Sequence, residues 1–407
     1  MVSRLPTLNL TPLKTHAHPQ ALNTMPNFDE PIDRRHHHSY KWTRYDDGDV
    51  IPLWVADMDF RPPAAVSDAL QQQLQHGVFG YTNDPIAELN AATIDYVKAL
   101  HGWSINAEWL VWLPSMVTGF NLACRIAGER GDGIACALPV YPPMRSAALH
   151  AERTAVTIPM RLRRERWILD FDALSANLSA QTRMLLFCNP HNPGGTVYTR
   201  EELDTLHHIA QRHDLLICSD EIHGDLVLDP QAKHLPFGSL NDDAAQRSVT
   251  LMAASKTYNI AGLCCGFAII PDTRLRQRYK QAMRGLITHV NVFGQIATHA
   301  AFRHGAAWRQ ALLDYLRGNL ALIIEQLGNL PGVKLYRPEA SFLVWMDVSA
   351  LNLNDPAAYF LQQGVAFSPG ADFGDPHCLR FNFGCTRGTL RTALHRIRQA
   401  IDALGPR

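Results

Sequence analysis

Short apolar runs that alternate with amphipathic stretches constrain the fold of this chain more than any other feature. Such runs occupy residues 133–138, 184–188, 215–219, 249–253 and 265–270. The stretch 200–213 between two of them has helical spacing, with acidic residues early and basic residues late, as a helix dipole prefers. Continuous apolar strands separated by amphipathic helices indicate a largely parallel sheet covered on both faces. We therefore predict an α/β fold.

The pattern changes towards the C-terminus. A long helical stretch at 308–327 is followed by short strands at 333–336, 341–348 and 379–383, which predicts a second, smaller α+β domain. Further helices are expected at 64–76, 86–100 and 119–127. We predict an irregular arm at 1–26, an N-terminal part of the small domain at 27–63, a large domain at 64–300 and the rest of the small domain at 301–407.

Composition excludes several classes of function. The 38 basic and 38 acidic side chains give a net charge of zero, which argues against binding of nucleic acid or of an anionic membrane. No apolar run approaches the length of a membrane-spanning helix, and the N-terminus lacks the apolar core of a signal peptide. Eight cysteines without a CxxC pair suggest buried thiols in a reducing compartment, so we predict a cytoplasmic location.

Polar motifs follow the apolar runs, where ligands bind in open α/β sheets. Lys256 lies among small and apolar residues in AASKTYNIAGLCCG, and a desolvated amine there could attack a carbonyl, although a surface loop is the alternative. Asp220 ends the strand LLICSD, where a carboxylate is costly unless it meets a cation such as a pyridinium nitrogen. The alternatives are a helix N-cap or a core carboxylate paired with an arginine. Asn189 and Asn192 lie in CNPHNPGGT, a rigid turn that either orients an amide or simply reverses the chain.

In this order, Asn192, Asp220 and Lys256 resemble the signature of fold-type I pyridoxal-phosphate (PLP) enzymes. More narrowly, NFDEPIDRRHHHSYKW, PLWVADMDF, FGYT, PVYPPM, NPHNPGGTVYT, SDEIHGDLV and SKTYNIAGL resemble the MalY/PatB group of cystathionine β-lyases, also called cysteine C–S lyases. The similarity runs from about residue 27 to residue 387. It implies a large domain with a mainly parallel seven-stranded sheet between helices, and a homodimer with shared active sites.

The resemblance implies a set of cofactor contacts. Lys256 is the Schiff-base lysine, and Asp220 keeps the pyridine nitrogen protonated so that the ring accepts electrons. Asn192 bonds the ring hydroxyl, and Tyr141 stacks on the ring. The phosphate is cradled by the backbone N–H groups of Met116 and Val117, by the hydroxyl of Ser255 and by Tyr81 of the neighbouring subunit.

Substrate contacts are implied in the same way. Arg380 in LRFNFG clamps the α-carboxylate as a bidentate fork. The segment that contains Trp54, Ala56 and Asp57 lines the substrate entrance and offers a backbone N–H group to that carboxylate.

Two positions differ from the aminotransferase pattern and favour the lyase group. His223 lies beside the cofactor in DEIH, where aminotransferases commonly have tyrosine. Cys264 replaces the arginine that usually binds the phosphate eight residues after the Schiff-base lysine, and the sequence names no compensating cation.

The implied reaction is α,β-elimination from cystathionine or a related cysteine S-conjugate. Lys256 removes the Cα proton, a thiolate leaves from Cβ, and pyruvate and ammonia are released. Two alternatives remain open at this point: an aminotransferase on the same scaffold, and a PLP-binding regulatory protein. Metal binding is not expected, because the adjacent residues 36–38, all histidine, are interpreted as a solvated segment.

Overall fold

A computed structural model describes residues 26–45, 48–81 and 85–405 of the 407-residue chain. The predicted irregular arm, apart from Pro26, lies outside these residues. The described part of the chain contains no helix that is both long enough and apolar enough to cross a membrane.

The large sheet contains eight strands in the order β2-β9-β8-β7-β6-β3-β4-β5. The pairings from β8 through β4 are parallel, whereas β9 and the two edge strands join by antiparallel pairings. The strands are β2 (Leu110–Leu113), β3 (Gly133–Leu138), β4 (Thr154–Arg163), β5 (Arg166–Leu169), β6 (Thr182–Cys188), β7 (Leu216–Asp220), β8 (Ser248–Met252) and β9 (Gly266–Ile269).

The prediction of seven strands is therefore wrong by one. The additional strand β5 forms a hairpin with β4, and the turn between them places Arg164 and Glu165 at positive φ angles of 49° and 64°. This strand has only four residues and follows a cluster of arginines, so it gives no continuous apolar run, although Ile168 and Leu169 are buried in the core.

Two layers of helices bury the two faces of the large sheet. Successive residues of β6 alternate between them: Met184 and Leu186 pack with α3 and α4, whereas Leu185 and Phe187 pack with α5 and α6. The helices of this part are α1 (Ala64–His76), α2 (Ala87–His101), α3 (Met116–Ile126), α4 (Pro142–His150), α5 (Phe171–Asn177), α6 (Arg200–Arg212), α7 (Asp242–Gln246), α8 (Ala254–Thr257), α9 (Thr273–Met283) and α10 (Val292–His304).

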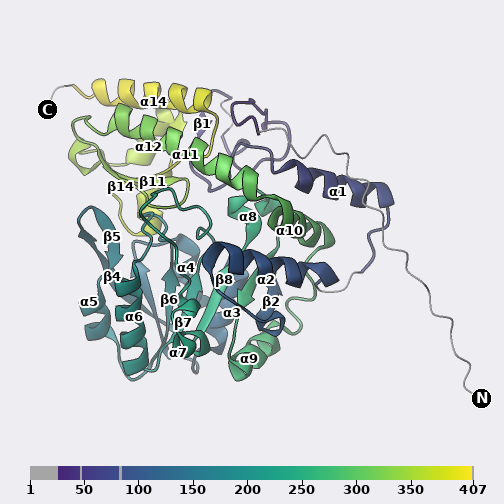
Figure 1. The fold of residues 1–407 in the computed structure, drawn as a ribbon. Coiled ribbons are helices and arrows are strands. Elements are labelled where there is room, and N and C mark those ends of the chain that lie inside the picture. The colour runs from purple at the N-terminus through teal and green to yellow at the C-terminus, as the bar shows by residue number, and fades with distance from the viewer. Residues whose placement is uncertain (1–25, 46–47, 82–84, 406–407) are drawn as a thin grey trace, which may run out of the picture.

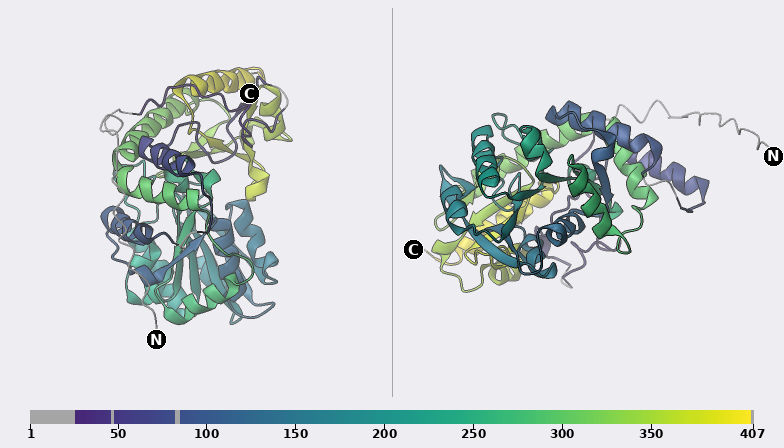
Figure 2. Two further views of the ribbon diagram at one scale, coloured as in Figure 1. Left: turned by 90° about the vertical axis from the view of Figure 1, so that its right-hand side faces the viewer. Right: turned by 90° about the horizontal axis from the view of Figure 1, so that it is seen from below.

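A second, four-stranded antiparallel sheet lies above the large sheet in Figure 1 and keeps this place in the first view of Figure 2. Its strand order is β10-β11-β14-β13, and the helices α11, α12 and α14 accompany it. The elements are α11 (Ala306–Leu327), β10 (Lys334–Tyr336), β11 (Leu343–Asp347), α12 (Pro356–Gln362), β12 (Val365–Ala366), β13 (Ser368–Pro369), α13 (Gly370–Phe373), β14 (Cys378–Asn382) and α14 (Arg387–Asp402).

The N-terminal residues join this second unit. Strand β1 (Ile51–Pro52) pairs in parallel with β12, so the backbone at 51–52 lies beside the backbone at 365–366. The predicted boundary between residues 300 and 301 falls inside α10, which packs against α1 and α2. The segment that follows β1 then passes to the carboxyl ends of the large-sheet strands, where the cavity described next is found.

Candidate active site

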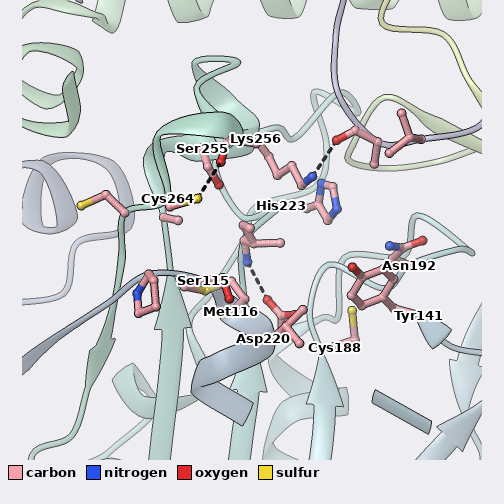
Figure 3. Close-up of a pocket in the computed structure, with 18 of the residues that line it drawn as sticks. Ser115, Met116, Tyr141, Cys188, Asn192, Asp220, His223, Ser255, Lys256 and Cys264 are labelled. Atoms are coloured by element: carbon pink, nitrogen blue, oxygen red, sulfur yellow. Dashed lines mark hydrogen bonds between the residues drawn. The ribbon is translucent and has the colours of Figure 1, made fainter. Parts of the chain in front are cut away.

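A cavity of about 220 Å³ lies at the carboxyl ends of the parallel strands. Most of the residues that the sequence singled out line it (Figure 3). They come from separate segments: the α3 N-terminus, the turns after β3, β6 and β7, helix α8, strand β14 and the segment after β1. The lining includes Ala56, Met116, Val117, Tyr141, Asn192, Asp220, His223, Ser255, Lys256 and Arg380.

Lys256 follows β8 on the one-turn helix α8 and extends its amine into the cavity (Figure 3). The amine donates a hydrogen bond of 2.6 Å to the carbonyl oxygen of Ala56. Burial lowers the pKa of Lys256 to about 8, with Asp57 raising and Arg380 lowering it. The unprotonated fraction of the amine near neutral pH is therefore much larger than that of an ordinary lysine, as a nucleophile or a general base requires.

Asp220 ends β7, and its carboxylate accepts a hydrogen bond from the Ile222 N–H at 3.3 Å. Burial raises the pKa of Asp220 to about 7. Behind it, the buried carboxylate of Glu221 accepts hydrogen bonds from Ser219 Oγ at 2.7 Å and from the Phe237 N–H at 3.0 Å, and it pairs with His234 Nε2 at 2.8 Å. Both carboxylate oxygens of Glu221 therefore accept hydrogen bonds, whereas the Asp220 carboxylate can still bind a cationic partner.

The turn after β6 is tied to the turn after β3 by a residue that the sequence analysis did not single out. His191 Nδ1 accepts the Gly194 N–H at 3.2 Å, and its Nε2 lies 3.1 Å from the carbonyl oxygen of Pro139. Burial lowers the pKa of His191 to about 4, so the ring is neutral and donates from Nε2. These contacts fix Asn192 relative to Tyr141, both of which face the cavity (Figure 3).

Arg380 enters the cavity from β14, one of the strands of the smaller sheet. Its guanidinium donates to Asn192 Oδ1 at 3.2 Å, to the carbonyl oxygen of Trp54 at 2.9 Å and to Ser368 Oγ at 3.1 Å. The Nε–H group is buried and has no hydrogen-bond partner among the residues that the structure describes. Burial lowers the pKa of Arg380 to about 10, which leaves it protonated at neutral pH. Arg380 thus offers a desolvated donor to an anionic group.

The opposite end of the cavity is formed by the α3 N-terminus, where Ser115 caps the helix by accepting the Thr118 N–H at 3.1 Å. The N–H groups of the first helical turn, including those of Met116 and Val117, have no partner within the helix and suit an anion. Ser255 and Cys264 lie near this end (Figure 3). Within the described residues, Lys256 and Arg380 are the only cationic side chains that line the cavity.

His223 lies beside the Lys256 side chain (Figure 3) and is buried. Its Nδ1 atom has no hydrogen-bond partner in the described part of the chain. Burial, together with the charges of Lys256 and Arg380, lowers the pKa of His223 to about 3. The imidazole is therefore neutral and available for a hydrogen bond with a bound molecule.

The remaining predicted residues lie differently. Val55 and Ala56 line the cavity, whereas Trp54 donates its indole N–H to the carbonyl oxygen of Lys41 at 3.2 Å. Asp57 forms an ion pair with Arg34 at 2.7 Å. Tyr81 is 98% exposed and is not among the lining residues, so within one chain it has no contact with the cavity.

The family model of aminotransferase class I and II matches residues 48–397. The chain belongs to this family. Cystathionine β-lyase PatB of Bacillus subtilis (strain 168) is 36% identical over 388 residues, which cover 92% of this chain and 100% of PatB. The resemblance to the MalY/PatB group is thereby confirmed.

Two solved structures are similar to this aminotransferase-family chain over most of its length. OvoB is 48% identical with a TM-score of 0.90, covering 92% of this chain and 99% of OvoB. The PLP-bound C–S lyase of Staphylococcus hominis is 29% identical with a TM-score of 0.87, covering 94% of this chain and 99% of that lyase. The predicted fold class is confirmed by these likenesses.

Proposed function

We propose that this member of the aminotransferase class I and II family is a PLP-dependent C–S β-lyase that cleaves cystathionine or a related cysteine S-conjugate to a thiol, pyruvate and ammonia. One observation carries the proposal: a buried amine, a buried carboxylate without a cation and a buried arginine with an unpartnered N–H converge on one cavity. The names of the relatives, cystathionine β-lyase and C–S lyase, support the reaction class.

The residues present fit PLP. The Asp220 carboxylate suits an ion pair with the protonated pyridine nitrogen, which supplies the cation that this buried carboxylate lacks. Asn192 and the neutral His223 suit the ring hydroxyl, and the Tyr141 ring suits stacking. Met116 and Val117 with Ser255 suit the phosphate. When bound, PLP withdraws electrons from the Cα of an amino acid joined to it.

The chain's own groups perform the remaining tasks. Arg380 binds the α-carboxylate through its unpartnered Nε–H, which fixes the direction of the Cα–H bond. Lys256, as an unprotonated amine, removes the Cα proton and later donates a proton to the leaving thiolate. The neutral His223 is a hydrogen-bonding group and not an acid, because its burial and, to a smaller extent, the nearby positive charges oppose its protonation.

An aminotransferase would use the same contacts, and the distinguishing step lies at the β-carbon. We expect the purified protein to convert L-cystathionine to equal amounts of pyruvate and free thiol, measured in parallel. Formation of a new amino acid from an added 2-oxo acid, with no thiol, would favour the aminotransferase alternative. Full cofactor binding without turnover of any amino acid would favour the regulatory alternative.

Removing the charge of Asp220 should affect the cofactor-free and cofactor-bound proteins in opposite directions. The folded cofactor-free protein keeps a proton on Asp220 up to about pH 7, whereas the unfolded chain releases it near pH 4, so this group lowers stability as the pH rises between these values. Asp220→Asn should therefore gain up to about 4 kcal/mol over wild type at pH 8 and nothing near pH 4. Urea unfolding at both pH values measures the difference.

The cofactor provides the control for this experiment. With PLP bound, the carboxylate of Asp220 pairs with the protonated ring nitrogen, so the same substitution should weaken cofactor binding and lower the stability of the loaded protein. An Asp220→Asn protein whose stability follows that of wild type at every pH, with and without PLP, would contradict the assignment.

We propose further that the chain acts as a homodimer, in which Tyr81 of one subunit contacts the phosphate bound by the other. The exposure of Tyr81 and of its neighbours Val78 and Phe79 supports this arrangement. Among the described residues, the cavity lining also offers no cationic side chain for a phosphate besides Lys256 and Arg380. The eight cysteines form no disulfide and six are buried, which supports a reducing, cytoplasmic location.

We propose two domains. The large domain comprises residues 64–300, and the small domain comprises residues 27–63 together with residues 301–407.

A subunit-mixing experiment tests the role of Tyr81. Tyr81→Ala should raise the dissociation constant of PLP by about tenfold, the factor for one lost hydrogen bond to a charged group. Lys256→Ala homodimers should be inactive, yet mixed dimers of the two variants contain one intact site and should regain part of the activity. Mixtures that never exceed the sum of the separate homodimers would contradict a shared site.

A further inference from the structure

Residues 54–60 are hereafter called the bridging segment, and two of them, Val55 and Ala56, line the cavity into which the amine of Lys256 extends. The hydrogen bond from Lys256 Nζ to the Ala56 carbonyl oxygen, at 2.6 Å, joins Lys256 to this segment. This contact is made by the unmodified amine, which is also the form that removes a proton. The position of the Ala56 carbonyl therefore determines where that amine rests.

One side chain attaches the bridging segment to the residues that follow helix α8, which carries Lys256. Asn259, three residues after Lys256, accepts the Met58 N–H at its Oδ1 at 2.9 Å. Its Nδ2 donates to the carbonyl oxygens of Met58 and Phe60 at 2.8 and 2.7 Å. Asn259 has a φ of 55°, a left-handed conformation that asparagine tolerates better than most residues. Asn259 thus links the residues that follow α8 to the bridging segment by direct hydrogen bonds.

A second amide attaches the same segment to the strand that carries Arg380. Asn382 is fully buried, and its Nδ2 donates to the carbonyl oxygens of Val55 and Asp57 at 2.5 and 2.7 Å, on either side of Ala56. Its Oδ1 accepts the Gly384 N–H at 2.8 Å. All hydrogen-bonding groups of this amide except one acceptor site are used, so its orientation is fixed.

Ion pairs hold the outer side of the bridging segment. Arg34 pairs with Asp57 at 2.7 Å and with Asp59 at 2.6 Å, and Lys41, which is completely buried, pairs with Asp59 at 2.8 Å. Removing one partner of such a buried set leaves an uncompensated charge, so this arrangement resists displacement. The bridging segment is therefore fixed by ion pairs on its outer side and by the hydrogen bonds of the Asn259 and Asn382 side chains on its inner side.

We propose that Asn259 and Asn382 are positioning residues that hold the Ala56 carbonyl oxygen where it accepts one hydrogen of the Lys256 amine, so that the lone pair of this amine is directed at the substrate Cα–H bond. This inference rests on the proposed role of Lys256 as the base. An amine has two hydrogens and one lone pair, and fixing one hydrogen restricts rotation about the Cε–Nζ bond. No covalent step is added to the reaction.

The test follows the exchange of the Cα proton of L-alanine in D₂O by NMR, using PLP-loaded protein. Alanine has no leaving group at Cβ, so the result is independent of whether the enzyme is a lyase. Asn382→Ala and Asn259→Gly should slow exchange on the order of 10- to 100-fold, because a base displaced by about 1 Å loses up to about 10²-fold in rate. The KM for alanine should change little, since Arg380 is untouched.

The chain offers matched controls for both substitutions. Asn319 is also fully buried and donates to two carbonyl oxygens, of Phe383 and Cys385, which lie outside the bridging segment, so Asn319→Ala controls for the lost buried amide. Asn352 is exposed with a φ of 51°, so Asn352→Gly controls for glycine at a left-handed position. Glycine adopts this conformation without strain, and Asn259→Gly should therefore fold.

A second readout uses the cofactor-free protein. Acylation of Lys256 by a trace of acetic anhydride, quantified by mass spectrometry, should be faster by about fivefold in the two test variants, the factor for one lost hydrogen bond. Exchange and acylation rates that change no more than in the controls would overturn the inference. Alanine exchange by a wild-type protein that forms no pyruvate from thioethers would refute only the lyase proposal, whereas absence of exchange would refute both.

Discussion

Replacing Lys256 with alanine should abolish β-elimination, with a loss of at least about 10⁴-fold, because one side chain provides both the covalent link to the cofactor and the base. Among the described residues, Lys256 is the only lysine that lines the cavity, so no neighbouring amine can substitute for it. The absorbance of lysine-linked PLP should disappear at the same time. Pyruvate formation and a visible spectrum of the same sample measure both effects.

Lys280→Ala is the matched control, since Lys280 lies exposed on α9, away from the cavity. This variant should keep wild-type spectrum and turnover. Normal turnover by Lys256→Ala would show that the assignment of the base and of the cofactor link is wrong.

Replacing Arg380 with alanine should lower kcat/KM for amino acids on the order of 10²- to 10³-fold, the range for truncating a buried, hydrogen-bonded charge pair. The side chain is buried, is fixed by Asn192, Ser368 and the Trp54 carbonyl, and presents its Nε–H to the cavity. The Nε–H group that binds an incoming carboxylate is therefore already desolvated. Steady-state kinetics with the thioether substrate measure the loss.

The selectivity for the carboxylate separates this role from a general structural one. Wild type should discriminate strongly against the decarboxylated analogue of the substrate, and Arg380→Ala should discriminate little. Arg380→Lys keeps the charge but lacks the planar fork, so it should recover only part of the rate. Equal selectivity in wild type and Arg380→Ala would count against a carboxylate site.

Much of the site could be predicted because its residues follow apolar strands. Lys256 comes after β8, Asp220 ends β7 and Asn192 lies in the turn after β6, and parallel strands bring these ends to one edge. Five of the eight strands of the large sheet (β3, β6, β7, β8 and β9) and the helices α1, α2, α3 and α6 were also predicted to within a few residues. Continuous apolar runs of this length mark buried strands.

The bridging segment could not be predicted in this way. Asn259 and Asn382 reach it across 201 and 327 positions of the sequence, through side-chain bonds to backbone atoms. Such bonds leave no periodic pattern, because any residue offers a backbone carbonyl as an acceptor. Glu221 and His191 escaped notice for the same reason, since each is identified only by what surrounds it.

The pairing of β1 with β12 has a consequence for the order in which the ribosome completes this protein. By the time the chain has been synthesised to Lys256, every residue proposed to contact the cofactor within one subunit has been made. Strand β1, which leads into the bridging segment, is made early but has no β12 to pair with until residue 366 emerges, and Arg380 follows later still. The nascent chain thus acquires its cofactor groups well before it can recognise a substrate.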